Sequence, residues 1–349
     1  MSRAAQEDVE NMSEQLVIGI DGGGTRLRAA ISTTAGELIG IGGAGSGNYH
    51  DVGADIVRSN VELAISRAWT AASTLPRQAD AIFLGLGSIV TGEDRATICR
   101  IVRDLSLVPV DNIGVDHDLR VALMGGLAGE AGAVLIAGTG SACYGRDARG
   151  RSWQAGGWGH VLDDPGSSFW LGRQAMIAAV RDHDGRGEAT RLQSRVMEAL
   201  QISDMRQILR RVELQGMTRS EIAALAPVVT ESAADGDSVA LALVERGVEE
   251  LATMAATVAE KLEFCRTMPR VPIVVTGGLT NAGSIFMAPL TNAIRRRIPS
   301  ADVTRPVLPP VLGAVLLAIE ALGVSICADT VSRLAEGYTA RNRPVCATH

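Results

Sequence analysis

The stretch Leu16-Val-Ile-Gly-Ile-Asp-Gly-Gly-Gly-Thr25, followed at once by the alternating segment Leu27–Ser32, decides the fold of this chain. An apolar strand ends in a carboxylate, three glycines and a hydroxyl, and the chain then turns into a second strand. We therefore expect a β-hairpin and not the strand-to-helix entry of a P-loop. Its glycines can donate N–H groups to a triphosphate, and Asp21 can hold a hydrated Mg²⁺. A glycine-rich hairpin without a ligand explains this motif alone equally well.

The composition indicates a globular chain. Its 349 residues suffice for two ordinary domains, and a hydrophobic content of 46% supports sizeable cores. Residues 1–14 are polar and acidic, without the apolar core of a signal peptide, so we expect a disordered tail and a cytoplasmic protein. No apolar run is as long as a membrane span. The net charge of −6 argues against nucleic acid as a partner.

Cysteine, histidine and lysine usage excludes several kinds of site. The five cysteines are far apart and form no CxxC pair, and the five histidines are equally scattered. Neither a zinc site nor a disulfide framework is indicated. Lys261 is the only lysine of the chain, which rules out a Walker-type P-loop because that motif requires Gly-Lys-Ser/Thr.

Hydrophobic periodicity predicts alternating strands and helices in the first third of the chain. We expect a strand over Glu37–Gly42, a helix over 52–72, a strand over Asp80–Gly87, a helix over Glu93–Leu105, a strand over Ile113–Val115 and a helix from Asp118 to Leu127.

A second series of strands begins near Gly132 and resembles the first. The expected elements are strands over Ala133–Ala137, Ala142–Arg146 and Ser152–Ala155, a mainly helical region over Gly166–Phe264 with its best helix at 237–264, a strand over Val271–Val275, and helices over Ala282–Arg297 and Val311–Leu322. Two hairpins with glycine–hydroxyl turns suggest a duplicated architecture of α/β layers in two lobes. Ligands of such sheets bind at the carboxyl ends of strands.

Two motifs in the first half of the chain each allow more than one interpretation. The segment Gly40–Gly45 matches GxGxxG, but no helix opens inside it, which disfavours a dinucleotide site. Asp118 begins a helix after an apolar strand. It is either a plain N-cap or a carboxylate that orients and deprotonates a substrate hydroxyl. Asp116 competes for that role, and we prefer Asp118 because it lies at the strand-to-helix junction.

Two further glycine-rich segments lie in the second half. Gly138-Thr-Gly-Ser141 is an ordinary turn or, paired with the first glycine turn, a second phosphate clamp. The segment Gly156–Gly166 contains Trp158 among glycines and then two carboxylates. A flat apolar ring beside hydroxyl acceptors suits a sugar, although a structural tryptophan explains this segment by itself.

Taken together, the motifs DGGGT, GxGN, strand-then-HD-helix, IAGTGS, GGWGH, TGGL and Pro-Pro-x-x-Gly-Ala resemble the BadF/BadG/BcrA/BcrD-type ATPase family, and within it the N-acetylglucosamine kinases. The resemblance extends from about Leu16 to Leu322. It implies a two-lobed ribonuclease-H-like (actin-like ATPase) α/β fold with an interlobe cleft. We expect one lobe over 15–128, a second over 129–325 with a helical insertion, and a C-terminal tail over 326–349.

The resemblance also implies roles for individual residues. Asp118 corresponds to the catalytic aspartate and also contacts the acceptor, and Asp21 corresponds to the residue that holds Mg²⁺ through water. ATP-binding positions correspond to Gly22, Gly23, Gly24, Thr25, Gly138, Thr139, Gly140, Gly277 and Gly278. Ser141 belongs to the second clamp and, as implied for the sugar kinases, the further acceptor positions correspond to Asn48, Gly157, Trp158, Gly159 and Asp164.

One departure leaves the substrate open. Members of the family usually have Gly-Asp-Glu-Gly where this chain has Asp163-Asp164-Pro165-Gly166. The expected activity is ATP-dependent phosphorylation of the 6-hydroxyl of N-acetylglucosamine or a related amino sugar, with glucosamine or another hexose as alternatives. The resemblance suggests a homodimer. A dehydratase-activating ATPase with a cysteine-held iron–sulfur cluster is the rival within the superfamily, and a sugar sensor without chemistry is a third reading.

Overall fold

The computed structural model describes residues 15–342, which form two compact units. Unit 1 contains the described residues up to Glu130 and those from Pro306 onward, and unit 2 is Ala131–Arg305. The sequence led us to expect residues 306–325 in the second lobe. They lie instead in unit 1, because the apolar helix in this segment packs against the first sheet. The expected disordered segment 1–14 and the last residues of the expected tail lie outside the described part of the chain.

Unit 1 is built on a five-stranded sheet with the order β3-β2-β1-β4-β5. The predicted hairpin is confirmed: the first two strands are antiparallel, with Asp21 opposite Arg28 and Gly22 opposite Leu27. The fourth and fifth strands run parallel to the first, so their carboxyl ends meet beside the hairpin turn. The strands are β1 (Leu16–Gly22), β2 (Leu27–Thr33), β3 (Leu38–Ala44), β4 (Ala81–Leu86) and β5 (Ile113–Asp116).

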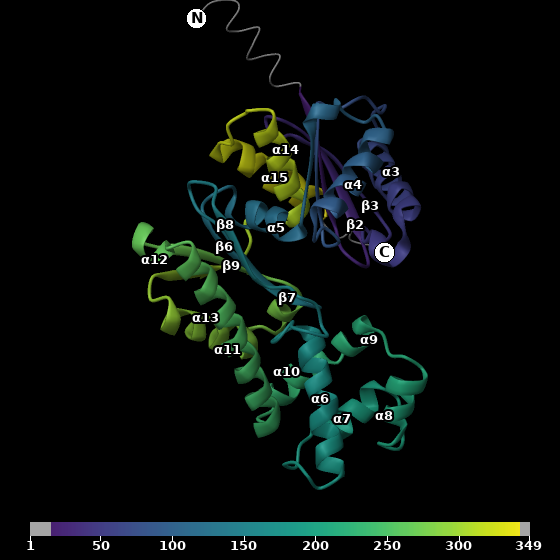
Figure 1. The fold of residues 1–349 in the computed structure, drawn as a ribbon, viewed down its shortest axis with the longest axis vertical. Helices are drawn as coiled ribbons and strands as arrows, with labels where there is room; N and C mark the ends of the chain where they lie inside the picture. Colours follow the sequence, from purple (N-terminus) through teal and green to yellow (C-terminus); the bar gives the residue numbers. More distant parts are fainter. Residues whose placement is uncertain (1–14, 343–349) are drawn as a thin grey trace, which may run out of the picture. The chain divides into compact units, whose positions relative to one another are not determined.

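Helices cover both faces of this sheet (Figure 1). Ile18 and Ile20 of β1 face a core shared with α3 and α4, whereas Val17 faces a core shared with α5, α14 and α15. A sheet buried on both faces explains why its strands are almost continuously apolar. The helical elements are α2 (Tyr49–Val52), α3 (Ala54–Ala71), α4 (Gly92–Asp104), η1 (Val110–Asn112), α5 (Asp118–Leu127), α14 (Pro310–Ala321) and α15 (Ala328–Arg341).

Unit 2 repeats the strand topology of unit 1. Its sheet has the order β10-β9-β6-β7-β8, with three antiparallel strands in a meander and two strands parallel to β6. The duplicated α/β architecture expected from the two hairpins is therefore present. The strands are β6 (Gly132–Ala137), β7 (Ser141–Arg146), β8 (Ser152–Gly156), β9 (Val271–Thr276) and β10 (Ala301–Thr304).

The helices of unit 2 share one large hydrophobic core with β6 and β9, in which Leu135, Leu251 and Ile273 are buried. The long apolar stripe predicted at 237–264 is α11, which packs against α13 and β7. The helical elements are α6 (Ser168–His183), α7 (Leu192–Ala199), α8 (Gln207–Leu209), η2 (Arg210–Leu214), α9 (Arg219–Ala223), α10 (Ala226–Ala234), α11 (Ser238–Lys261), α12 (Phe264–Thr267), η3 (Gly278–Ala282) and α13 (Ser284–Arg297).

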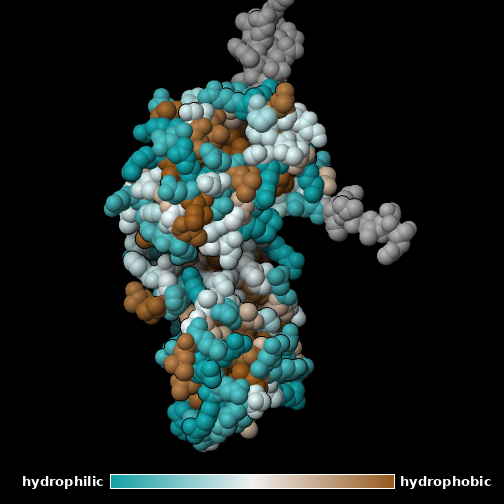
Figure 2. All heavy atoms as spheres, turned by 90° about the vertical axis from the view of Figure 1, so that its right-hand side faces the viewer, coloured by the Kyte–Doolittle hydropathy of each residue, from teal (hydrophilic) through white to brown (hydrophobic). Residues whose placement is uncertain are grey.

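Within residues 15–342, no helix is long and apolar enough to cross a membrane. The face of the molecule in Figure 2 is mostly hydrophilic, with separate hydrophobic patches.

Close contacts between glycine and neighbouring backbone hold α14 to the rest of unit 1. A Cβ atom at Gly313 of α14 would overlap with the carbonyl oxygen of Val121 in α5. A Cβ at Gly19 of β1 would overlap with the backbone of Val315. Helix α14 therefore approaches both elements more closely than any larger residue permits.

We expect Gly313→Ala to lower the free energy of unfolding of the protein by about 1–3 kcal/mol, because α5 and α14 must move apart. Gly92→Ala in α4 is the matched control, since a Cβ there meets open space, and its effect should stay within about 0.5 kcal/mol. Urea denaturation of both variants measures the difference. Equal stabilities would contradict the close packing of α14.

Candidate functional site

The first glycine turn, Gly22–Thr25, is held by two neighbouring loops. The carbonyl oxygen of Gly22 accepts the N–H of Gly87 at 2.9 Å, and that of Gly23 accepts the N–H of Gly47 at 3.0 Å. Both carbonyls, which would repel a phosphate, are thus directed into the protein. A Cβ at Gly23 would meet no atom within 4 Å, and Gly24 and Thr25 are exposed. The turn is therefore open to a ligand on its outer side.

Two carboxylates lie beside this turn. Asp21 is the last residue but one of β1, and Asp118 begins α5. A Cβ at Gly87 would lie 3.1 Å from Oδ2 of Asp118. Burial, and then repulsion from Asp118, raises the pKa of Asp21 to about 7. Burial also raises the pKa of Asp118, against the lowering effect of His117 and of nearby backbone N–H groups. One divalent cation near Asp21 would relieve this repulsion, so the pair fits Mg²⁺ bound mainly through water and phosphate oxygens.

The structure separates the roles of Asp116 and Asp118. The N-cap of α5 is His117, whose Nδ1 accepts the N–H of Arg120, so the carboxylate of Asp118 is not the cap. Asp116 forms ion pairs with Arg95 at 2.8 Å and with Arg120 at 2.7 Å. Burial acts to raise its pKa, but the hydrogen bonds from Arg120 and from the N–H of His117 hold that pKa below the usual value. Asp116 is thus fixed by structural partners, and the geometry favours Asp118 as the reactive carboxylate.

Asn48 lies next to the loop that holds the first glycine turn. Its side-chain oxygen accepts the N–H of His50 and caps α2, and its amide nitrogen donates to Asp51 at 2.7 Å. A Cβ at Gly24 would lie 3.7 Å from the carboxylate of Asp51. Asp21, Gly22–Thr25, Asn48 and Asp118 are therefore brought together at one edge of the sheet of unit 1.

The second glycine turn, Gly138–Ser141, repeats the first in its hydrogen bonding. Its carbonyls are again directed into the protein: Gly140 accepts from the N–H of Gly138, Gly138 from Ser168, and Thr139 from Phe169. The last two donors belong to the first turn of α6, so this helix fixes the turn. The hydroxyl of Ser141 is engaged internally, because it donates to the carbonyl of Pro165 at 2.8 Å.

Gly277 and Gly278 follow β9, beside the second glycine turn. Gly277 has a φ of +111°, and a Cβ there would overlap with the carbonyl of Ala137. Only glycine lets these two strand ends approach so closely. A Cβ at Gly278 would meet no atom within 4 Å, so this side of the second turn is open.

Asp164 is buried against the second turn. Its Oδ1 accepts the N–H of Ser141 at 3.1 Å, and its Oδ2 forms an ion pair with Arg219 at 2.6 Å. Asp164 has a φ of +62°, an unfavourable conformation for a residue with a side chain. The sequence reasoning missed Arg219, which lies in the helical region and belongs to no recognisable motif. Thr218-x-x-Glu221 is a capping box that marks the start of α9 but indicates no site.

The loop between β8 and α6 exposes its apolar residues. Trp158 is 76% exposed, and Val161 and Leu162 are each 82% exposed. Gly157 and Gly159 on either side have positive φ angles, and the carbonyl of Gly159 accepts the N–H groups of Leu162 and Asp163. The indole ring is therefore available to a ligand rather than packed in the core.

Comparison with known proteins identifies the family of this chain. The chain matches the BadF/BadG/BcrA/BcrD ATPase family over residues 18–318. It is 31% identical to an N-acetylmuramic acid/N-acetylglucosamine kinase of Clostridium acetobutylicum, over 76% of this chain and 85% of that protein. It is 27% identical to an N-acetyl-D-glucosamine kinase of Dictyostelium discoideum, over 88% of this chain and 99% of that protein.

Solved structures share the fold. A putative N-acetylglucosamine kinase from Chromobacterium violaceum superposes with a TM-score of 0.70 at 25% identity and covers 88% of this chain and 99% of its own. A ROK family glucokinase from Streptomyces griseus, solved with glucose and AMPPNP, has a TM-score of 0.56 at 17% identity and covers 88% of this chain and 98% of its own. The predicted two-lobed α/β fold of the actin-like ATPases and the family resemblance are both confirmed.

We expect Asp21→Asn to raise the stability of the ligand-free protein at pH 8 by up to about 4 kcal/mol. The pKa of this carboxyl rises from 3.8 to about 7 on folding, so the native state retains a proton that the unfolded chain releases. The wild-type protein therefore loses stability as the pH rises from about 4 to about 7, and the variant lacks this loss. Urea unfolding of the wild type and the variant at pH 5 and pH 8 gives the free energy of unfolding of each. If the variant exceeds the wild type by the same amount at both pH values, the shifted pKa is contradicted.

Proposed function

Because this chain belongs to the BadF/BadG/BcrA/BcrD ATPase family, we propose that it is an ATP-dependent kinase that phosphorylates the 6-hydroxyl of N-acetylglucosamine or a related amino sugar. The observation that carries this proposal is the carboxylate of Asp118, buried beside Asp21 and the first glycine turn without serving as a helix cap. The amino-sugar acceptor is supported by the names of the relatives in Clostridium acetobutylicum and Dictyostelium discoideum.

The two glycine turns are the proposed phosphate-binding elements. In each, carbonyl oxygens are hydrogen-bonded inside the protein, and one N–H closes the turn, that of Gly23 onto Arg26 and that of Gly138 onto Gly140. The N–H groups that follow in each turn are the polar atoms that suit a phosphate. In unit 1 this role falls to Gly22, Gly23, Gly24 and Thr25. In unit 2 it falls to Gly138, Thr139 and Gly140, with Gly277 and Gly278 on the adenosine side.

In the proposed reaction, Asp118 orients the sugar hydroxyl and accepts its proton. The hydroxyl oxygen bonds to the γ-phosphorus while the bond from that phosphorus to the β,γ-bridging oxygen breaks, which yields ADP and a sugar phosphate. A carboxylate whose pKa is raised by burial is a better proton acceptor than an exposed one. Most of the acceleration of phosphoryl transfer comes from positioning and electrostatics, so Asp118 acts chiefly through orientation. Mg²⁺, when bound near Asp21, neutralises charge on the transferred phosphoryl group.

Asn48, Ser141, Gly157, Trp158, Gly159 and Asp164 are the further proposed acceptor positions. The exposed ring of Trp158 offers a flat apolar surface for a sugar face. Asp164 is held by Ser141 and Arg219 in the absence of sugar. A sugar hydroxyl at this carboxylate would therefore share it with Arg219. The proposal includes a cytoplasmic location, expected from the composition of the sequence, and a homodimer, which rests on the family resemblance.

The expected effect of Asp118→Asn is a fall in kcat of about 100-fold or more, because the amide cannot accept the proton of the hydroxyl. ATP affinity should remain close to that of the wild type. A coupled ADP-release assay and calorimetric ATP titration measure the two properties. Asp116→Asn is the matched control, because it removes a carboxylate from the same loop. An unchanged kcat for Asp118→Asn would reject Asp118 as the reactive carboxylate.

The acceptor class is tested by ADP release with a panel of sugars. We expect N-acetylglucosamine or glucosamine to stimulate ADP release by at least about tenfold over ATP alone, since acceptor binding completes the site. Release that no sugar stimulates would favour the dehydratase-activating ATPase, and sugar binding without ADP release would favour a sensor.

A further inference from the structure

Two loops of unit 1 flank the first glycine turn and are joined to each other. One contains Gly47 and Asn48 and leads into α2, and the other runs from Gly87 to Thr91 and leads into α4. Each donates a backbone N–H to the turn. The hydroxyl of Ser88 also donates to the carbonyl of Gly47 at 3.4 Å. The two loops therefore form one hydrogen-bonded wall beside the first turn.

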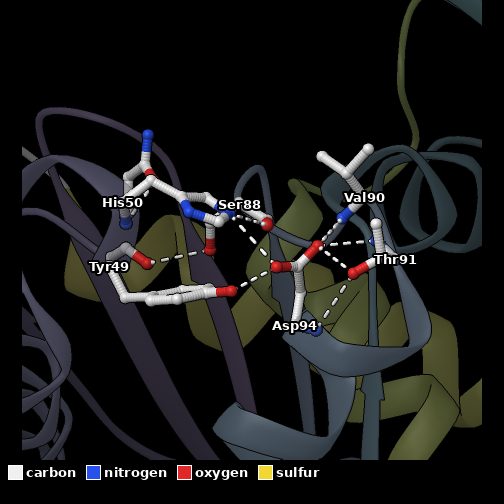
Figure 3. A network of polar contacts seen from close by, with 8 residues as sticks. Tyr49, His50, Ser88, Val90, Thr91 and Asp94 are labelled. Carbon is white, nitrogen blue, oxygen red and sulfur yellow. Dashed lines mark hydrogen bonds and ion pairs between the residues drawn. The ribbon is translucent and has the colours of Figure 1, made fainter.

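The carboxylate of Asp94, in the first turn of α4, is only 5% exposed and is shared between both loops (Figure 3). Its Oδ2 accepts the N–H of Val90 at 2.9 Å and both the N–H and the hydroxyl of Thr91, at 2.6 and 2.9 Å. Together with the N–H of Asp94, which donates to the hydroxyl of Thr91, these contacts form a capping box. One carboxylate oxygen is sufficient for it.

The second oxygen reaches the other loop. Oδ1 of Asp94 accepts the hydroxyl of Tyr49 and lies 3.2 Å from Nε2 of His50, which is also 3.2 Å from the carbonyl of Ser88 (Figure 3). The hydrogen bond to Asp94 raises the pKa of Tyr49 to about 12, and the pKa of Asp94 is held well below its usual value. A helix cap requires none of these contacts, which join segments 45 residues apart in sequence.

Helix α2 depends on this connection for its position. It has four residues, none of them fully buried, and of these Tyr49 and Val52 pack against the core of unit 1. Its N-cap is Asn48, and the two residues that contact Asp94 follow directly. The orientation of Asn48 is thus coupled through Tyr49 and His50 to a buried charge on α4.

We propose that Asp94 is a positioning residue of the acceptor site, which acts through Tyr49 and His50 to fix Asn48 beside the first glycine turn. This inference rests on the proposed sugar-kinase function. It assigns Asp94 and Tyr49 no contact with either substrate. Their contribution is to order one wall of the acceptor site before the sugar binds, and so to reduce the cost of binding.

Tyr49→Phe tests this inference, because it removes the hydroxyl and keeps the ring. We expect the KM for the amino sugar to rise about tenfold, which corresponds to the loss of one hydrogen bond to a charged group. The KM for ATP should change by less than about twofold. Steady-state kinetics with each substrate varied in turn gives both values.

Thr91→Ala is the matched control, because it weakens the contacts of the same carboxylate on its other oxygen. It should lower the melting temperature through loss of the cap, with the sugar KM within about twofold of wild type. An unchanged sugar KM in Tyr49→Phe would overturn the inference. The inference would also fail if Tyr49→Phe and Thr91→Ala each raised the KM for the sugar and the KM for ATP by the same factor. If the wild-type protein phosphorylates no sugar, the proposed function itself fails, and this outcome is distinct from both.

Discussion

The placement of two partly buried carboxylates beside one glycine turn is the constraint on which unit 1 depends. Burial raises the pKa of both Asp21 and Asp118, and repulsion from Asp118 raises that of Asp21 further. Folding tolerates this arrangement because the surrounding elements are firmly held: α14 packs tightly on β1, and Gly87 and Gly47 fix the turn. A stable scaffold that carries an unfavourable charge pair is typical of a site selected for chemistry at the expense of stability.

The two units share their strand topology and the hydrogen bonding of their glycine turns. Each has a meander of three antiparallel strands with two further parallel strands, and each has a glycine–hydroxyl turn after its first strand. Each turn directs its carbonyl oxygens into the protein, although the donors differ: loop glycines in unit 1 and the start of α6 in unit 2. Under the proposed function, the chemistry of the ligand explains why both turns share this feature. A polyanion requires N–H groups and excludes carbonyl oxygens.

Local patterns predicted most of the fold. The hairpin of Leu16–Thr33, the helix from Asp118 and the stripe of α11 follow from strong periodicity and glycine turns. Strand β10 was not predicted, because its four residues include only two apolar ones and lie at a sheet edge. The packing of α14 in unit 1 could not be predicted either, because the local sequence of an apolar helix does not determine which sheet it covers. Arg219 and the second role of Asp94 were missed because both depend on contacts between residues distant in sequence.

The proposed activity of this chain is transfer of the γ-phosphoryl group from ATP to a sugar hydroxyl at Asp118. Phosphorus NMR of the products formed from ATP, Mg²⁺ and N-acetylglucosamine tests it most directly. The expected result is one new phosphomonoester signal, correlated with the protons on C6 of the sugar and formed in the same amount as ADP. Inorganic phosphate formed at the same rate with and without the sugar, with no sugar phosphate, would contradict the account.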